Sequence, residues 1–125
     1  DYNSVDVDFP NEDIQVLSFP DQSYSLVICN HVLEHIPDDD LALAECARIL
    51  QAGGVAIFTI PGDFRKLTTR HFDHPDSNGH YRHYGMEIVD QMKRHFRAVE
   101  ALDMSQVAEP NWRVRSYDYA FLCSK

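Results

Sequence analysis

Histidines beside acidic and basic residues offer this chain's clearest catalytic chemistry. His31 and His35 flank Glu34 in the segment HVLEH, and His80 lies in a histidine-rich segment further along the chain. An imidazole titrates near neutral pH and can remove a proton from an oxygen nucleophile. Arg82 adds a planar guanidinium that can hold a carboxylate or phosphate through two parallel hydrogen bonds. The candidate catalytic residues are therefore His31, His35, His80 and Arg82.

The same segments could instead bind a metal ion, but the residues around them argue against this interpretation. HVLEH has the H-x-x-E-H spacing of inverted zinc-protease sites, so His31, Glu34 and His35 would suit a metal-dependent hydrolase if the segment were helical. Helices of that kind continue for several turns, whereas Pro37 follows two residues after His35. The histidines between residues 71 and 83 match no standard zinc spacing and have no cysteine nearby. We predict no metal ligand, and the hydrolase stays an alternative.

Two strands and a helix must position these side chains. Tyr24–Cys29 (YSLVIC) and Val55–Ile60 (VAIFTI) are apolar, β-rich runs of the kind found in covered parallel strands. Between them, Asp38–Leu50 has its apolar residues at helical spacing, and Gly53-Gly54 is predicted to end that helix. A strand, a crossover helix and a second strand form a βαβ unit with a right-handed crossover.

Polar residues follow both predicted strands. Asn30 and His31 leave the first strand, where short side chains and backbone carbonyls can hold a ligand's amino group. The second strand leads into residues 62–83, a loop longer than the ~15 residues that compact domains usually tolerate without a function. Ligands of open parallel sheets bind beyond the carboxyl ends of the strands. We therefore expect segments 30–35 and 61–84 to meet in one cleft, with the long loop facing the substrate.

The rest of the chain supplies further elements of an α/β domain. Apolar spacing predicts a helix over Gly85–Phe96, and Ala98–Met104 and Ser116–Cys123 are predicted to be two final strands. Residues 5–9 alternate as a strand does. Because no linker, repeat or low-complexity segment interrupts the chain, residues 1–125 are predicted to form a single domain.

Composition narrows the classes of partner. The chain has 11 basic and 20 acidic residues and a formal net charge of −9, which argues against charge-driven binding to nucleic acid or an anionic membrane. No apolar run approaches the ~20 residues that cross a bilayer. Cys29, Cys46 and Cys123 form no C-x-x-C pair and fall in predicted strands and a helix. They indicate reduced core cysteines and a cytoplasmic location.

Several segments along the chain match motifs of one enzyme family: Phe19-Pro20-Asp21, VLEHIPD at 32–38, Arg48-Ile49-Leu50, Gly53-Gly54, HYRHYG at 80–85, and the closing FRAVEALDM and DYAFLCSK. With these segments the chain resembles the class I S-adenosylmethionine-dependent methyltransferases of the type 11-like group. The similarity is to the second half of that family and extends over nearly the whole chain. It implies an α/β, Rossmann-like, doubly wound and mostly parallel sheet with a carboxyl-terminal antiparallel strand pair, incomplete at its amino-terminal side. It also implies methyl transfer to a small-molecule oxygen, nitrogen or carbon.

The resemblance further implies contacts to S-adenosylmethionine. In the family, an acid placed like Asp13 accepts a hydrogen bond from the adenine amine, and the next apolar residue, here Ile14, packs on the ring. Asn30 and His31 would hold the cofactor's amino group. The family's glycine-rich loop has no counterpart, because the five glycines form no G-x-G-x-G. We therefore expect a fragment or truncated relative whose exposed sheet flank favours a homodimer. A non-catalytic remnant or interaction module is the remaining alternative.

One branch of the family adds a cation. Some quinone-pathway O-methyltransferases similar to this chain bind a divalent cation at a pair matching Glu34-His35. His31 stands where those relatives carry an acid, which makes the position less suited to a hard cation. Alternatively, Glu34 and His35 serve the local structure alone.

Overall fold

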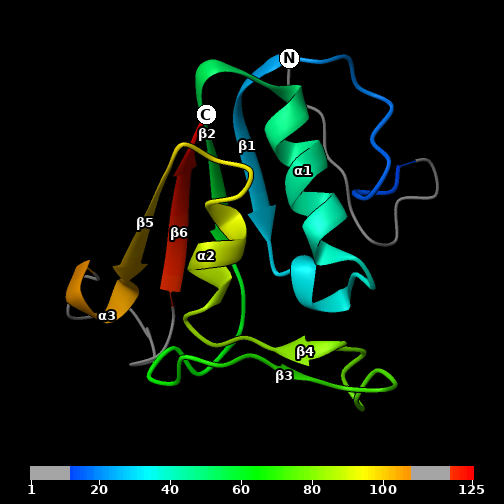
Figure 1. The fold of residues 1–125 in the computed structure, drawn as a ribbon, viewed down its shortest axis with the longest axis vertical. Helices are drawn as coiled ribbons and strands as arrows, with labels where there is room; N and C mark the ends of the chain where they lie inside the picture. Colours follow the sequence, from blue (N-terminus) through cyan, green and yellow to red (C-terminus); the bar gives the residue numbers. More distant parts are fainter. Residues whose placement is uncertain (1–11, 108–118) are drawn as a thin grey trace.

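In the computed structural model, which describes residues 12–107 and 119–125, four strands form one sheet in the order β1–β2–β6–β5 (Figure 1). β1 and β2 run parallel, and β6 lies between β2 and β5, antiparallel to both. The α/β fold class and the carboxyl-terminal antiparallel pair are therefore as predicted. The strands are β1 (Tyr24–Asn30), β2 (Leu50–Thr59), β5 (Ala98–Asp103) and β6 (Tyr119–Ser124).

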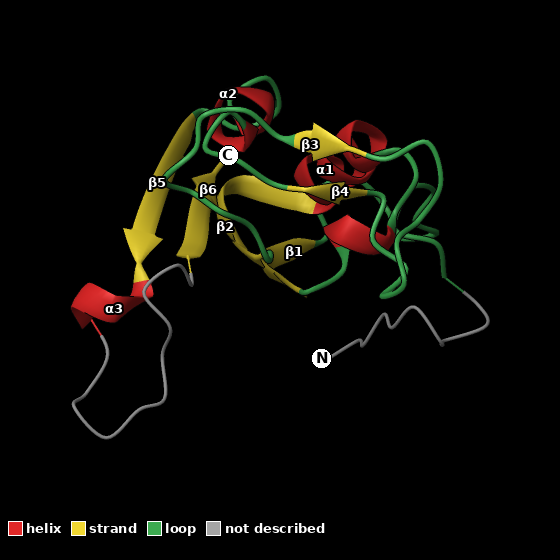
Figure 2. Ribbon diagram, turned by 90° about the horizontal axis from the view of Figure 1, so that it is seen from below, coloured by secondary structure: helices red, strands yellow, loops and turns green. Residues whose placement is uncertain are grey.

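Helix α1 (Asp39–Ile49) makes the crossover from β1 to β2, preceded by a 3-10 turn, η1 (Leu33–His35). Asp38 caps α1, because its carboxylate accepts a hydrogen bond from the backbone N–H of Leu41 at 3.0 Å. Helix α2 (Ile88–Met92) lies beside α1 on the same face of the sheet (Figure 2). None of the described helices, which include the short α3 (Met104–Val107), is long and apolar enough to cross a membrane.

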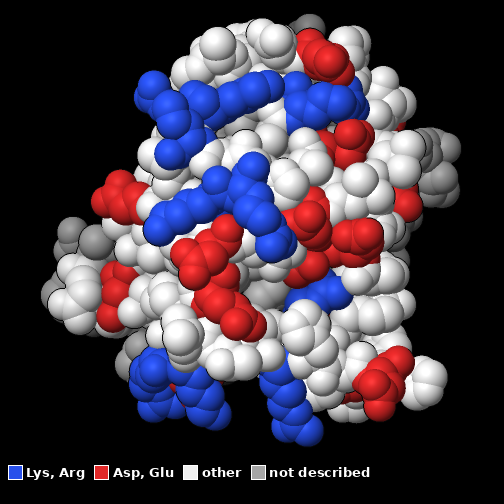
Figure 3. All heavy atoms as spheres, viewed as in Figure 1, with Lys and Arg blue, Asp and Glu red and all other residues white. Residues whose placement is uncertain are grey.

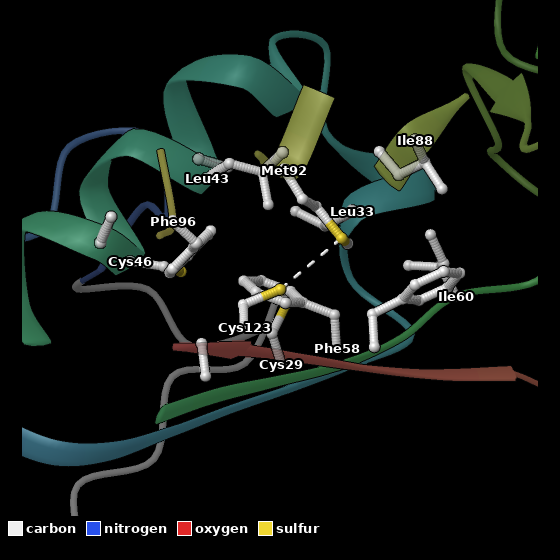
Figure 4. Close-up of a cluster of buried hydrophobic side chains, with 14 of the residues drawn as sticks. Cys29, Leu33, Leu43, Cys46, Phe58, Ile60, Ile88, Met92, Phe96 and Cys123 are labelled. Carbon is white, nitrogen blue, oxygen red and sulfur yellow. Dashed lines mark hydrogen bonds between the residues drawn. The ribbon is translucent and has the colours of Figure 1, made fainter. Parts of the chain in front are cut away.

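The core lies between these two helices and the sheet (Figure 4). Leu43 from α1, Met92 from α2 and Phe58 from β2 are fully buried there. All three cysteines are free and buried, as predicted, and the Cys123 thiol lies 3.7 Å from the Met92 sulfur. Burial raises the pKa of the Cys46 and Cys123 thiols to about 12, so both remain unreactive core groups.

The end of α1 differs from the prediction. The helix ends at Ile49, and Leu50 already belongs to β2, so Gly53-Gly54 lies inside the strand and does not cap the helix. The last carbonyls of the helix are satisfied from another segment: Arg48 O and Ile49 O accept hydrogen bonds from the turn before β1. Gly53 has φ 76° at a bulge where the register of β2 against β1 shifts.

The lengths of two other segments also differ from the prediction. Within the predicted helix 85–96, α2 spans five residues, although Ile88, Met92 and Phe96 are buried as their spacing predicted. The predicted loop 62–83 contains a short hairpin of two strands, β3 (Arg70–His71) and β4 (Arg82–His83). The predicted strand at 5–9 and the start of the predicted strand at 116–123 lie outside the described residues.

Candidate functional site

The carboxyl ends of β1 and β2 lie side by side at one edge of the sheet. Asn30 pairs with Thr59, whose hydroxyl hydrogen-bonds to the Asn30 side chain, and the His31 N–H donates to Thr59 O at 2.8 Å. His31 has φ 53°, in the left-handed region, so the chain turns sharply where β1 ends. The side chains of Asn30 and His31 are exposed at this edge. Both loops that we predicted to form the site thus begin at one place.

The hairpin β3–β4 lies across this edge, at the bottom of Figure 1. Gly62 permits the approach, because a Cβ there would overlap the carbonyl of Tyr84, to which the Asp63 N–H donates at 2.9 Å. The Tyr81 N–H donates to Glu34 O at 2.8 Å. Segments 30–35 and 61–84 are therefore in direct contact, as predicted, and the shared cleft stays a prediction.

Glu34 lies at the centre of this contact. Its side chain is only 1% exposed, and its Oε1 is 3.4 Å from His31 Nδ1 and 3.9 Å from His35 Nε2. Glu34 Oε2 is buried without a hydrogen-bond partner among the described residues. The His35 ring packs edge-on against the His80 ring, with centroids 4.8 Å apart. The structure thus gathers three of the predicted catalytic histidines around a carboxylate that can orient them.

The premise of the hydrolase alternative is wrong. That interpretation needs His31 and His35 on one face of a helix that runs for several turns. The helical part is a single 3-10 turn over Leu33–His35, and His31 precedes it in a left-handed conformation. The carboxylate of Glu34 nevertheless faces both imidazoles, which favours orientation of the histidines over a protease-like zinc site.

The interpretation of Arg82 as a substrate clamp is also wrong. Arg82 is 4% exposed, and its guanidinium donates to the carbonyls of Leu33 (3.1 Å), Ile36 (2.8 Å) and Pro37 (2.7 Å). It also lies 3.3 Å from the carboxylate of Asp39. Because these groups occupy both terminal nitrogens, Arg82 fixes the loop after β1 against β4. It has no free pair of N–H groups with which to bind a substrate.

Asp13 and Ile14 lie in a separate tight turn. The Asp13 carboxylate accepts hydrogen bonds from the backbone N–H of Gln15 at 2.9 Å and from its side-chain amide at 3.1 Å. Ile14 is half-buried against the core. The Gln15 side chain in turn accepts from the Asp38 N–H at 3.1 Å, which ties the turn to the start of α1. Their adenine contact stays a prediction.

Two further features of the hairpin were not predicted. Asp76, His80 and His83 offer ligand atoms that all lie within 4.8 Å of one another. A hollow of about 300 Å³ also opens between the hairpin and α2. None of the predicted site residues lines this hollow, whose walls are Thr69, His71, Glu87, Asp90, Gln91 and Arg94.

The surface over α1 and α2 mixes both signs of charge. In Figure 3, lysine and arginine side chains lie at the top, in the middle and at the bottom of this face, interspersed with acidic side chains. One ion pair between the two signs of charge joins Arg94 Nη2 to Asp40 Oδ1, at 2.8 Å. This face therefore offers no continuous basic surface of the kind that attracts nucleic acid.

Solved methyltransferases share this fold. A SAM-dependent methyltransferase from Thermotoga maritima aligns with a TM-score of 0.61 and 17% identity, over 90% of this chain and 61% of its own. Phosphoethanolamine N-methyltransferase 2 from Haemonchus contortus, solved with phosphomonomethylethanolamine and S-adenosylhomocysteine, aligns with a TM-score of 0.61 and 15% identity, over 90% of this chain and 36% of its own. The fold is thus the Rossmann-like fold of class I methyltransferases, of which the chain covers part.

Sequence comparisons agree with the fold. The family model described as "Methyltransferase domain" matches residues 1–58. The ubiquinone biosynthesis O-methyltransferase of Coxiella burnetii is 29% identical over 62 residues, which are 49% of this chain and 26% of that protein. Both sequence comparisons are to methyltransferases, and the match spans about a quarter of the length of this curated relative.

Proposed function

We propose that the protein transfers a methyl group from S-adenosylmethionine to a small-molecule acceptor. One observation supports this most strongly. Within a methyltransferase fold, His31 lies at the carboxyl end of β1 beside the buried carboxylate of Glu34, and Glu34 and His35 contact the hairpin segment that holds His80. The similar proteins include one named for ubiquinone biosynthesis and one solved with phosphomonomethylethanolamine, so a small acceptor is the substrate class we assign.

The residues present suit part of the cofactor. S-adenosylmethionine supplies an electrophilic methyl group on a sulfonium. Asn30 and the backbone of His31, exposed where the chain turns at the end of β1, would hold its amino group. Asp13 and Ile14 would contact the adenine, with an acceptor oxygen for the amine and an apolar surface for the ring. The sequence has no glycine-rich loop to add to these contacts.

His31 is the group that we assign as the general base. Its Nδ1 faces Glu34 Oε1 at 3.4 Å, so Nε2, on the opposite side of the ring, is left for the acceptor's proton. Glu34, on the Nδ1 side, fixes the orientation of the His31 ring. His35 and His80 line the contact with the hairpin, where they would position the acceptor and exclude water. The chain's own contribution to catalysis is therefore orientation and removal of one proton.

The test separates cofactor binding from proton removal. S-adenosylhomocysteine binding is measured by calorimetry, and transfer of labelled methyl is measured with a panel of phenols and amines. His31→Gln should bind S-adenosylhomocysteine as the unmodified chain does and transfer methyl to a phenol at least about 100-fold more slowly, the usual contribution of a general base. His74→Gln, on the exposed part of the hairpin segment, is the matched control and should change neither quantity.

Two results would refute the proposal. A chain that binds no S-adenosylhomocysteine would be the non-catalytic module of the family. Full methyl transfer by His31→Gln would remove His31 as the base.

We also infer a cytoplasmic location. Cys29, Cys46 and Cys123 are free and buried, although an oxidising compartment favours disulfides. Detection of the protein in a secreted or periplasmic fraction would contradict this inference.

A further inference from the structure

We propose that the hairpin binds a divalent transition-metal ion through Asp76, His80 and His83. The set shares His80 with the residues that would position the acceptor, but it includes neither the assigned base nor a predicted cofactor contact, so the two proposals are tested by different variants. Their spacing matches no standard zinc pattern, so the site was not predicted from the sequence. The fold of the hairpin brings the three side chains together, with ligand atoms within 4.8 Å of one another.

The distances are close to those of a coordinated ion. Asp76 Oδ2 lies 3.2 Å from His83 Nε2 and 3.9 Å from His80 Nδ1. Metal–ligand bonds of about 2.0–2.1 Å in a tetrahedral zinc site place neighbouring ligand atoms roughly 3.3 Å apart. The Asp76–His83 pair already meets this spacing, and the Asp76–His80 pair exceeds it by about 0.6 Å.

Asp76 is held in place by the loop that contains it. Its Oδ1 accepts hydrogen bonds from the backbone N–H groups of Asn78 at 2.8 Å and His80 at 3.0 Å. The loop closes through backbone bonds from Asp76 N to His80 O and from Gly79 N to Asp76 O. With Oδ1 fixed by two donors, Oδ2 is directed at the two imidazoles.

Neighbouring rings restrain both histidines. The Phe72 ring contacts the His83 ring edge-on, with centroids 4.9 Å apart, and the His35 ring contacts His80 at 4.8 Å. His83 lies on β4, whereas Asp76 and His80 lie in or next to the loop between β3 and β4. A bound ion would therefore fasten the loop to β4 and restrain the hairpin over the edge of the sheet.

The ligand set selects the class of ion. Two imidazole nitrogens and one carboxylate oxygen suit Zn²⁺, Co²⁺ or Ni²⁺ better than Mg²⁺ or Ca²⁺, which prefer oxygen ligands. Three protein ligands leave at least one coordination position for water or an external ligand. His83 is 52% exposed, so an ion can reach the site from solvent.

A second group of candidate metal ligands competes with this site and shares one residue with it. Glu34, His35 and His80 also have ligand atoms within 4.8 Å of one another. Glu34 is almost completely buried, and its Oε1 already faces His31 and His35. The Asp76 set is favoured because an ion needs an entry path from water.

The experiment titrates Co²⁺ into the chelator-treated chain without cofactor and follows the visible absorption of the bound ion, then displaces it with Zn²⁺. Asp76→Asn and His83→Gln should each weaken Co²⁺ binding at least about tenfold, since loss of even an outer partner of a metal ligand costs that much. Asp76→Asn keeps an Oδ1 acceptor for the two backbone N–H groups, so the loop should persist. His71→Gln and His74→Gln, exposed histidines outside the cluster, are the matched controls and should bind Co²⁺ as the unmodified chain does.

Each other outcome overturns the proposal. No Co²⁺ absorption with the unmodified chain means that the site is absent. Loss of binding in His35→Gln together with full binding in His83→Gln would assign the ion to the competing set. Circular dichroism verifies that each variant folds. If Asp76→Asn does not fold, the Co²⁺ affinity of His83→Gln, replaced at a half-exposed position, decides whether the site exists. Failure here leaves S-adenosylhomocysteine binding and methyl transfer unaffected, so the two proposals are tested separately.

Discussion

At the scale of residues, Glu34 connects the site in two ways. Its side chain faces His31 and His35, and its backbone oxygen accepts the hydrogen bond from Tyr81 of the hairpin segment. A buried carboxylate whose second oxygen has no hydrogen-bond partner among the described residues costs free energy that a neutral apolar residue would not. Local costs of this kind are typical of functional sites. The position of Glu34 therefore supports a role in orienting the histidines over a role in stability.

Arg82, in contrast, serves stability and not the orientation of catalytic groups, and its replacement tests this assignment. Arg82→Met should lower the free energy of unfolding by about 3 kcal/mol or more, because it removes the cation beside the buried Asp39 carboxylate and the guanidinium donors to the carbonyls of Ile36 and Pro37. Urea unfolding measures the change. Arg70→Ala, on exposed β3, removes a contact to the Phe72 ring and should cost about 1 kcal/mol or less. Unchanged stability of Arg82→Met, with a raised KM for the acceptor, would restore the substrate-binding interpretation.

The sequence predicted side chains at strand ends better than side chains whose partners are distant. Asn30 and His31 were placed correctly at the end of a strand because an apolar β run has a recognisable limit. Arg82 was misassigned because arginine is usually exposed, and the carbonyls that surround it belong to residues 33–37, far away in sequence. Asp76 was missed for a related reason: its ligand geometry arises from a loop that closes on itself.

At the scale of elements, apolar spacing predicted which residues enter the core but not how long each helix is. Ile88, Met92 and Phe96 are buried, yet regular helix covers only Ile88–Met92. The end of α1 was mispredicted because the glycines that follow it are part of a strand bulge. Its terminal carbonyls instead find donors in the turn before β1, a tertiary contact that local sequence does not reveal.

The contact between α1 and the segment after α2 predicts a dependence on pH. Asp40 Oδ1 accepts hydrogen bonds from His95 Nε2 at 2.9 Å and Arg94 Nη2 at 2.8 Å. These bonds, that of His95 foremost, lower the pKa of Asp40 in the folded chain. Because the folded pKa lies below the unfolded one, the contact stabilises the chain above the ordinary aspartate pKa of about 4 and is lost as pH falls through the folded value.

Asp40→Asn should therefore reduce the free energy of unfolding at neutral pH by about 0.5 kcal/mol, the scale of a partly exposed ion pair. At a pH well below the aspartate pKa, the variant and the unmodified chain should be equally stable. Urea unfolding at the two pH values measures both differences. Asp73→Asn, at an exposed position of the hairpin segment, is the control and should show no such convergence. A stability difference that persists in acid would contradict the assigned role of Asp40.

At the scale of the whole molecule, the two faces of the sheet differ. The described helices α1 and α2 cover one face, whereas Leu26 and Ile28 of β1 are 50% and 66% exposed (Figure 2). Among the described strands, β1 pairs only with β2 and stands at one end of the sheet order. An apolar strand at the edge of a sheet is a template for pairing with another chain. Its most available partner is the same strand of a second copy, related by a twofold axis.

We therefore expect self-association through β1, detected as elution by size exclusion that shifts to larger species as protein concentration rises. Leu26→Lys and Ile28→Lys should each shift the equilibrium toward monomer, because pairing would then bring like charges together and bury less apolar surface. Leu67→Lys is the matched control: Leu67 is equally exposed but lies outside the sheet, so its replacement should leave elution unchanged. A monomer at every concentration would contradict the expectation, as would equal effects of all three replacements, since general solubility and not strand pairing would then govern association.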